Sequence, residues 1–130
     1  MMTRVLVLGA TGDQGHPLLT RLMDAGFTPV AALRNPDAFQ GTEFAHVETV
    51  QADLYDTQSM ISAAKGTDAI AANLPFVFDR EMAASLGNNI AAAANENGVK
   101  KIVFNTSCFV AETDNDNSAH DGRRDIEQAI

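Results

Sequence analysis

Three glycines near the start of the chain have the spacing of a phosphate-binding turn. Gly9, Gly12 and Gly15 stand in the stretch GATGDQG, directly after the apolar run VLVL. The first glycine of such a turn permits the tight bend, the second lets the backbone approach a pyrophosphate, and the third lets the following helix pack on its strand. A plain tight bend is the alternative. We favour the phosphate cradle because the turn follows a strand and opens a helix, whose N-terminus attracts anions.

A basic residue stands at the end of a second apolar run. Arg34 follows VAAL and precedes Asn35. At this place in a dinucleotide site a carboxylate suits the free ribose 2′-hydroxyl of NAD, whereas an arginine suits the 2′-phosphate of NADP. The residue type therefore predicts NADP(H) rather than NAD. Two observations oppose this: exposed arginines are common, and Asp13 in the glycine turn places a negative charge near the added phosphate.

Two further strand ends supply polar groups. Asp53 and Leu54 end the third expected strand, where a carboxylate and the adjacent backbone can bond the edge of an adenine. A simple cap of the next turn is the alternative for Asp53. The fourth expected strand ends at Asn73, Leu74 and Pro75, which we expect beneath the ribose and the nicotinamide side of the cofactor.

Alternating strand and helix patterns position these groups. We expect strands at 3–8, 28–33, 46–53, 68–74 and 100–107, and helices at 14–25, 56–65, 80–97 and 123–130. Residues 35–39 are expected to form a short turn or helix, and the polar segment 111–122 a loop. The order predicts an α/β fold with a doubly wound parallel sheet, Rossmann-like, of strand order 3-2-1-4-5, in a single dinucleotide-binding domain over residues 1–130.

Composition excludes several functional classes. Seventeen acidic against nine basic side chains give a net charge of −8, which argues against nucleic acid as a partner. Cys108 is the single cysteine, so an internal disulfide and a cysteine zinc cluster are both excluded. Arginines interrupt the apolar runs before they reach the roughly 20 residues that a membrane span needs. We therefore expect a cytoplasmic protein without a membrane or metal partner.

Taken together, VLVLGATGDQG, ALRNP, QADL, IAANLP and AAAANENGVKKIVFNTS resemble the atypical short-chain dehydrogenases/reductases, and within them the NmrA-like proteins, which bind NADP(H). The resemblance extends from about Thr3 to Ser107, and more faintly to Ile130. It implies contacts with the pyrophosphate from Gly9, Thr11, Gly12, Asp13, Gln14 and Gly15. It also implies Arg34 at the 2′-phosphate, Asp53 and Leu54 near the adenine, and Asn73, Leu74 and Pro75 along the ribose.

The same resemblance directs attention to a catalytic pattern. Reductases of this class combine a serine after the fifth strand with Tyr-x-x-x-Lys, in which the lysine lowers the pKa of the tyrosine. Here Ser107 is present, and His120 and Arg124 stand at the matching distance. His120 can donate a proton near neutral pH, but an arginine is not a tunable base, and Tyr55 stands in another segment. An exposed loop histidine is the alternative for His120.

Two functions therefore remain open from the sequence. The first is an NADPH-dependent reductase of a small carbonyl or quinone, and the second is a non-catalytic, NADP(H)-sensing regulatory protein. Family members continue well beyond this point, so we expect a sheet truncated after its fifth strand, without the family's C-terminal substrate region. The fifth strand would then be an open edge, which a second copy in a homo-oligomer or a partner protein would cover.

Overall fold

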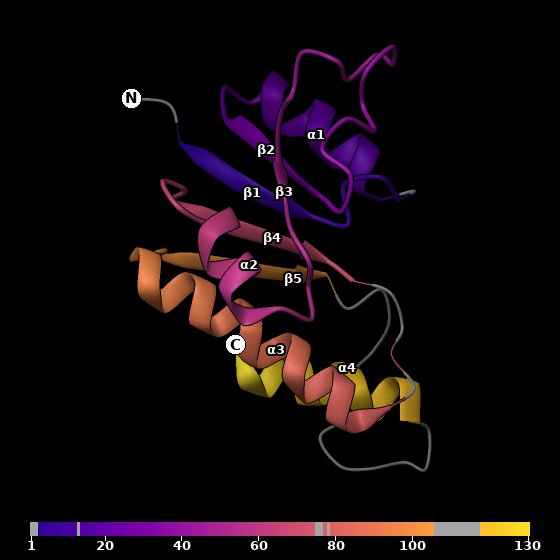
Figure 1. Cartoon of the computed structure of the whole chain (residues 1–130), viewed down its shortest axis with the longest axis vertical. Coiled ribbons are helices and arrows are strands. Elements are labelled where there is room, and N and C mark those ends of the chain that lie inside the picture. The colour runs from indigo at the N-terminus through magenta and orange to yellow at the C-terminus, as the bar shows by residue number, and fades with distance from the viewer. Residues whose placement is uncertain (1–2, 13, 75–76, 78, 106–117) are drawn as a thin grey trace.

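The computed structural model describes residues 3–12, 14–74, 77, 79–105 and 118–130, with the side chains of residues 118–120 left aside. Five parallel strands form one sheet of order β3-β2-β1-β4-β5 (Figure 1). The strands are β1 (Arg4–Leu8), β2 (Thr28–Leu33), β3 (Glu48–Gln51), β4 (Ala69–Asn73) and β5 (Lys101–Asn105). The helices are α1 (Gly15–Asp24), α2 (Thr57–Ala63), α3 (Arg80–Asn97) and α4 (Ser118–Ala129). The predicted α/β class and strand order are confirmed.

The central strand β1 is buried on both faces of the sheet. It pairs with β2 on one side and β4 on the other. Leu6 and Leu8 belong to the core beneath α2 and α3, whereas Val5 and Val7 belong to the core that includes Leu19 of α1. Successive side chains of a strand point to opposite faces, so an unbroken apolar run is what a strand covered on both faces requires.

The helices differ in how they begin. Asp56 caps α2 by accepting a hydrogen bond from the Ser59 N–H at 3.1 Å. Asp79 caps α3 by accepting from the N–H groups of Glu81 and Met82. The N-cap position of α1, Gln14, makes no such side-chain bond within the described residues. The amino end of α1 is thus the one of these three helix starts that no side chain caps, and it adjoins the glycine-rich turn.

Between β2 and β3 the chain forms successive turns. The N–H of Ala38 bonds to the carbonyl of Asn35 at 3.1 Å, and the N–H of Gln40 to that of Asp37 at 3.0 Å. Phe39 and Phe44 from this segment are buried in the core on the α1 face. The expected short turn or helix at 35–39 is therefore a turn, and two aromatic anchors hold it on the sheet.

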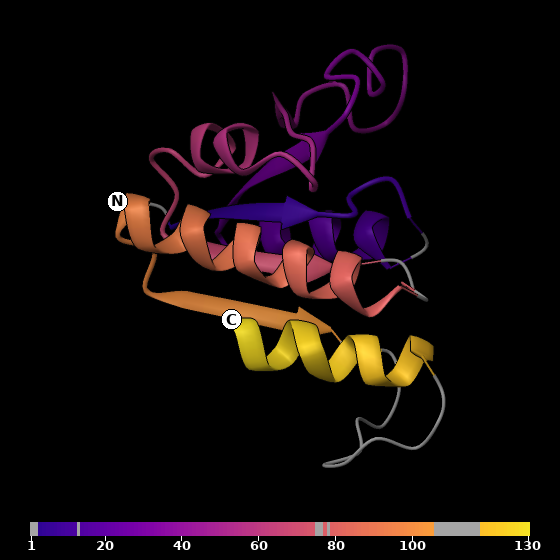
Figure 2. The same ribbon diagram turned by 60° about the horizontal axis from the view of Figure 1, so that its bottom comes forward.

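The expectation of a loop over 111–122 is wrong for its last part, because α4 already begins at Ser118; residues 111–117 lie outside the described ones. Figure 2 shows α4 lying alongside α3. Their approach is close, since a Cβ on Gly87 of α3 would lie 2.7 Å from the Ala129 Cβ of α4. Asp121 and Arg124 are buried and paired at 3.5 Å. A polar composition predicted exposure, but these charges are neutralised within the helix and packed against the fold.

Strand β5 forms one edge of the sheet. Its side chains alternate in exposure, and Val103 is 52% exposed. That a further chain covers this strand remains a prediction. Among the described residues, none of the helices combines the length and the apolar character needed to cross a bilayer.

The ion pair between Arg80 and Asp125 connects α3 to α4 and predicts a pH dependence. Arg80 Nε lies 2.8 Å from Asp125 Oδ2, and this hydrogen bond holds the pKa of the Asp125 carboxyl below its ordinary value. A lowered folded-state pKa contributes stability that is present above the unfolded value, near 4, and disappears as the pH falls through the folded one. We expect Asp125→Asn to lower the urea unfolding midpoint at about pH 7, and the difference from the unsubstituted protein to shrink as the pH falls below about 4.

Asp24→Asn, which alters an exposed carboxylate in α1, is the matched control and should leave the midpoint nearly unchanged. A loss in Asp125→Asn that persisted undiminished in acid would show that the residue acts through packing and not through its charge.

Candidate functional site

Two cavities open side by side at the carboxyl ends of the parallel strands. Their volumes are about 470 and 420 Å³, and both include Gly9 and Thr11 in their linings. The first is also lined by Leu8, Ala10, Ala32, Leu33, Arg34, Asn35, Ala38, Ala52, Asp53, Leu54 and Tyr55. The second is also lined by Gly12, Gln14, Gly15, Asn73 and Leu74. The glycine-rich turn therefore forms the wall that the two cavities share.

The three glycines of this turn have different local surroundings. Gly9 has φ of +71°, and a Cβ there would overlap the carbonyl oxygen of Asn73. A Cβ on Gly15 would overlap the carbonyl oxygen of Gly9 and lie 2.7 Å from Ala10 Cα. The chain's own packing thus requires glycine at both positions. At Gly12 the nearest such atom is the Gly9 carbonyl oxygen at 3.5 Å, which is ordinary contact.

Gly12 is consequently the glycine that internal packing does not explain. It is exposed and lines the second cavity, one turn from the start of α1. A plain bend would accept alanine here, whereas a group lying against the backbone would not. This difference favours the phosphate cradle over the simple turn, because a helix N-terminus and a bare backbone together suit an anion.

Side-chain amides connect two polar lining residues of the second cavity, Gln14 and Asn73, to the end of β5. Asn105, at the end of β5, donates through Nδ2 to Gln14 Oε1 at 2.7 Å and to Asn73 Oδ1 at 3.4 Å. Asn73 in turn donates to the Leu8 carbonyl at 3.5 Å. The network ties the start of α1 to the ends of β1, β4 and β5. It fixes the polar rim of the cavity without a charged side chain.

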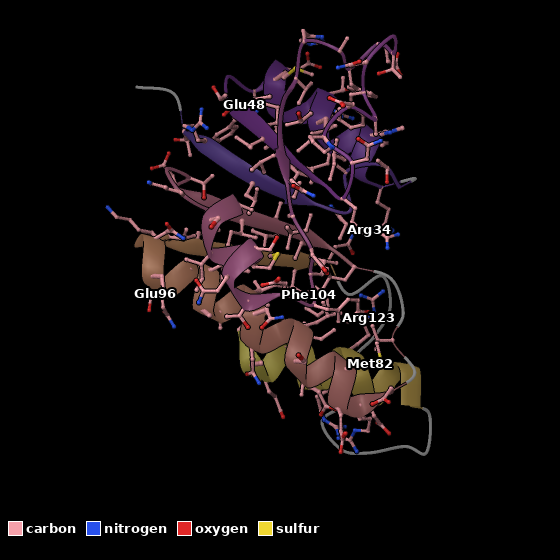
Figure 3. All side chains as sticks on the ribbon, viewed as in Figure 1. Arg34, Glu48, Met82, Glu96, Phe104 and Arg123 are labelled. Atoms are coloured by element: carbon pink, nitrogen blue, oxygen red, sulfur yellow. The ribbon has the colours of Figure 1, made fainter. Side chains whose placement is uncertain are left out.

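Arg34 is the cation that lines the first cavity within the described residues. It is exposed, and Figure 3 shows its side chain extending from the end of β2 on the side where the turn joins β1 to α1. Asn35 lies beside it in the lining, and its Oδ1 accepts from the Asp37 N–H at 3.0 Å. A fixed positive charge beside an amide can bind an anionic group at the mouth of the cavity.

Asp53 serves the turn after β3 and also lines the first cavity. Its Oδ1 accepts from the N–H of Tyr55 at 2.9 Å, and its own N–H donates to Ser59 Oγ at 2.9 Å. Asn89, buried on α3, donates to the Leu54 carbonyl at 2.9 Å and accepts from the Thr57 hydroxyl at 2.7 Å. Asp53 therefore does cap the turn after β3, as the alternative had it, and its side chain also lines the cavity.

The catalytic candidates are described only in part. Ser107 lies outside the described residues, as do Asp13 and Pro75 among the cofactor candidates, and only the backbone of His120 is described. Arg124 is buried and ion-paired with Asp121, and the described linings of the two cavities do not include it. The structure thus places the described cofactor candidates in the linings of the two cavities, whereas the catalytic roles remain predictions.

The neighbouring Arg123 supports the end of β4. It is 2% exposed, donates through Nη2 to the Leu74 carbonyl at 2.8 Å and lies over the Phe104 ring at 5.5 Å. Figure 3 shows Arg123 and Phe104 where α4 meets the sheet. Because Leu74 lines the second cavity, α4 contributes to its shape through a buried guanidinium.

Among the described residues, the resolved pKa shifts belong to ion pairs away from the cavities. At the amino ends of the strands, away from the cavities, Arg4 forms a two-pronged bond with Glu48, at 2.7 and 2.8 Å, which lowers the pKa of the Glu48 carboxyl. Figure 3 shows Glu48 at that end. The cavities therefore offer hydrogen-bonding groups and the Arg34 charge.

Sequence reasoning missed several residues of the site. Asn89, Asn105 and Arg123 act through contacts 35, 91 and 49 residues away along the chain, which no local pattern shows. Tyr55 is an aromatic residue two positions after Asp53, at a strand end, and this position could have marked it as a lining residue. We considered it only as a catalytic tyrosine. Small apolar residues such as Ala38 carry no signal at all.

The sequence model of the NmrA-like family matches residues 1–130. The chain belongs to the NmrA-like family. A curated relative of this chain is the (4-alkanoyl-5-oxo-2,5-dihydrofuran-3-yl)methyl phosphate reductase of Streptomyces griseus subsp. griseus, which is 32% identical over 128 residues. The match covers 97% of this chain and 42% of that reductase, so the chain spans less than half of its relative's length.

Solved structures share the fold of this NmrA-like chain. Citrobacter sp. triphenylmethane reductase complexed with NADP(H) superposes with a TM-score of 0.80 at 20% identity, over 99% of this chain and 45% of that one. The NADPH-dependent quinone oxidoreductase of Escherichia coli superposes with a TM-score of 0.70 at 24% identity, over 96% of this chain and 42% of that one. At these identities the likeness is one of fold.

The contrast between Gly9 and Gly12 makes a direct prediction about stability. Gly12→Ala should change the free energy of unfolding by less than about 0.5 kcal/mol, because its Cβ meets only ordinary contacts. Gly9→Ala should lower it by more than about 2 kcal/mol, because a positive φ and an overlapped carbonyl both oppose the side chain. Urea unfolding of both variants measures the difference. Equal losses would mean that Gly12 is also required by the fold.

Proposed function

We propose that the chain binds NADP(H) across the two cavities and is the cofactor-binding part of a reductase. The adenosine half would occupy the first cavity, the pyrophosphate would lie against the shared glycine wall, and the nicotinamide half would enter the second. Membership of the NmrA-like family and 32% identity to a reductase support this proposal. The fold it shares with a reductase complexed with NADP(H) is consistent with it.

The single observation that carries the proposal is the bare backbone at Gly12. It lies in the lining at the uncapped amino end of α1, where nothing in the described chain requires a glycine. A pyrophosphate needs close backbone approach and a positive helix end, and both are present here. The residues therefore fit the diphosphate of a dinucleotide.

The preference for NADP(H) rests on Arg34. The first cavity is large enough for a nucleoside, and Arg34 with Asn35 stands at its rim. An arginine there can form charge-assisted hydrogen bonds with the 2′-phosphate of NADP. The 2′-hydroxyl of NAD carries no charge and cannot form such bonds. NADP is thus the proposed cofactor, with NAD as the weaker ligand.

The chemistry of the proposed reductase divides between cofactor and chain. When bound, NADPH supplies a hydride, which reduces a small carbonyl or quinone once a proton is added. The described residues bind and orient: Asn73 and Leu74 border the nicotinamide side, and Arg123 holds the Leu74 carbonyl in place. Ser107, His120 and Arg124 remain the proposed catalytic residues. Ser107 and His120 would transfer the proton, and Arg124 would be a fixed positive charge that positions them.

A regulatory function is the second candidate, and the second cavity favours it in one respect. Its described polar side chains are those of Thr11, Gln14 and Asn73, none of which titrates near neutral pH. A site of this kind can hold a nicotinamide without reducing anything. Such a protein would sense the ratio of NADPH to NADP⁺.

Arg34→Gln tests the choice of cofactor. We expect it to weaken NADPH binding about ten- to a hundredfold, the loss typical of one charge-assisted bond, while NADH binding stays within about twofold. Calorimetric titration with both dinucleotides measures the effect. Arg21→Gln, an exposed arginine on α1, is the matched control and should bind both as before. An equal loss for NADPH and NADH would contradict a 2′-phosphate contact.

A turnover assay separates the two functions. For a reductase we expect NADPH oxidation above background with at least one member of a panel of quinones and small carbonyls, and Asn73→Ala should reduce it by perturbing the nicotinamide side. If the protein binds NADPH in the calorimeter yet oxidises none with any acceptor, the reductase proposal fails and the regulatory one stands.

A further inference from the structure

An exposed aromatic side chain stands in the wall of the first cavity. Tyr55 is 49% exposed, although large apolar rings are usually covered in a folded domain. It lines the same cavity as Leu54 and as Ala38 of the turns that follow β2. Among the described residues of this lining it is the one aromatic. The cavity thus combines a flat, accessible ring with small apolar surroundings.

The turn that presents Tyr55 is held rigidly. The Tyr55 N–H donates to Asp53 Oδ1 at 2.9 Å, and the Asp56 N–H donates to the Asp53 carbonyl at 3.1 Å. The Asp53 N–H is held by Ser59 Oγ at 2.9 Å, and Asn89 of α3 holds the Leu54 carbonyl at 2.9 Å. A backbone fixed on both sides of the ring lowers the entropy that binding must remove. The ring is prepared for a ligand before the ligand arrives.

We propose that Tyr55 is the stacking platform for the purine base of the dinucleotide and a determinant of its affinity. This inference rests on the proposed function, since it assigns a residue to the adenine end of the same site. Arg34 at the rim fixes the phosphate on the ribose, so the base attached to that ribose lies within the same cavity. Of the described lining residues, Tyr55 offers the π-face on which a base can stack.

The role belongs to the ring and not to the hydroxyl group. Stacking between a base and an aromatic side chain depends on the overlap of the two π-faces, which phenylalanine preserves. Tyr55→Phe should therefore bind NADPH within about twofold of the unsubstituted protein, and Tyr55→Ala should bind about tenfold or more weakly. A residue that merely supported the turn would show a different pattern, because its loss would destabilise the protein.

The chain offers a direct optical test. Tyr55 is its only tyrosine and it has no tryptophan, so the tyrosine emission reports on this ring alone. We expect 2′,5′-ADP, the adenosine half of the cofactor, to quench that emission saturably after correction for absorbance. Nicotinamide mononucleotide, the other half, should leave it unchanged. Free N-acetyltyrosinamide titrated with the same ligands accounts for collisional quenching.

Calorimetry of the variants completes the test, with Phe27→Ala as the matched control. Phe27 is also an exposed ring, at 37%, but it precedes β2 at the opposite end of the sheet. It should bind NADPH as the unsubstituted protein does. Urea unfolding of each variant separates a loss of affinity from a loss of structure.

The possible results separate the role of Tyr55 from the proposed NADP(H) site. If NADPH binds while 2′,5′-ADP leaves the Tyr55 emission unchanged, or if Tyr55→Ala folds and binds NADPH with full affinity, the stacking platform is overturned and the NADP(H) site stands. If neither NADPH nor 2′,5′-ADP binds the unsubstituted protein, both are overturned.

Discussion

The close approach of the end of β1 to the end of β4 determines the geometry of the site. Gly9 lies so near the Asn73 carbonyl that any side chain at this position would overlap it. Strand order reverses at this junction, because β2 and β3 lie to one side of β1 and β4 and β5 to the other. In open α/β sheets the crevice outside such a switch point is where ligands bind. The turn leaving β1 must pass over it, and so becomes the wall shared by both cavities.

Distant parts of the chain then fix each cavity. Asn89 on α3 secures the turn after β3 in the first, and Asn105 joins β5 to the glycine turn in the second. Arg123, buried over Phe104, holds the carbonyl of Leu74 from α4. Asn89 and Arg123 make these bonds in buried places, where an unmade hydrogen bond costs stability, whereas Asn105 is exposed. Both cavities are therefore preformed, and less conformational entropy is lost when a ligand binds.

Local sequence patterns predicted most of the fold because both faces of the sheet are covered. A strand as apolar as β1 must be covered on both faces, and the helices that cover the sheet were expected from the periodic spacing of their apolar residues. The polar composition predicted a loop up to residue 122, but α4 already begins at Ser118. The ion pair between Asp121 and Arg124 allows this polar stretch to be buried as a helix. The glycine turn, Arg34 and Asp53 could be placed because they follow strands directly. Asn89, Asn105 and Arg123 could not be, since their partners are chosen by tertiary packing alone.

We have proposed that one dinucleotide spans both cavities along the shared glycine wall. Hydrogen–deuterium exchange with and without saturating NADPH tests this proposal, because it locates the contact along the backbone. We expect slower exchange in segments 8–16, 32–38 and 52–56, around the glycine turn and the ends of β2 and β3. Protection confined to α3 and α4, or none at all while NADPH is bound, would contradict it.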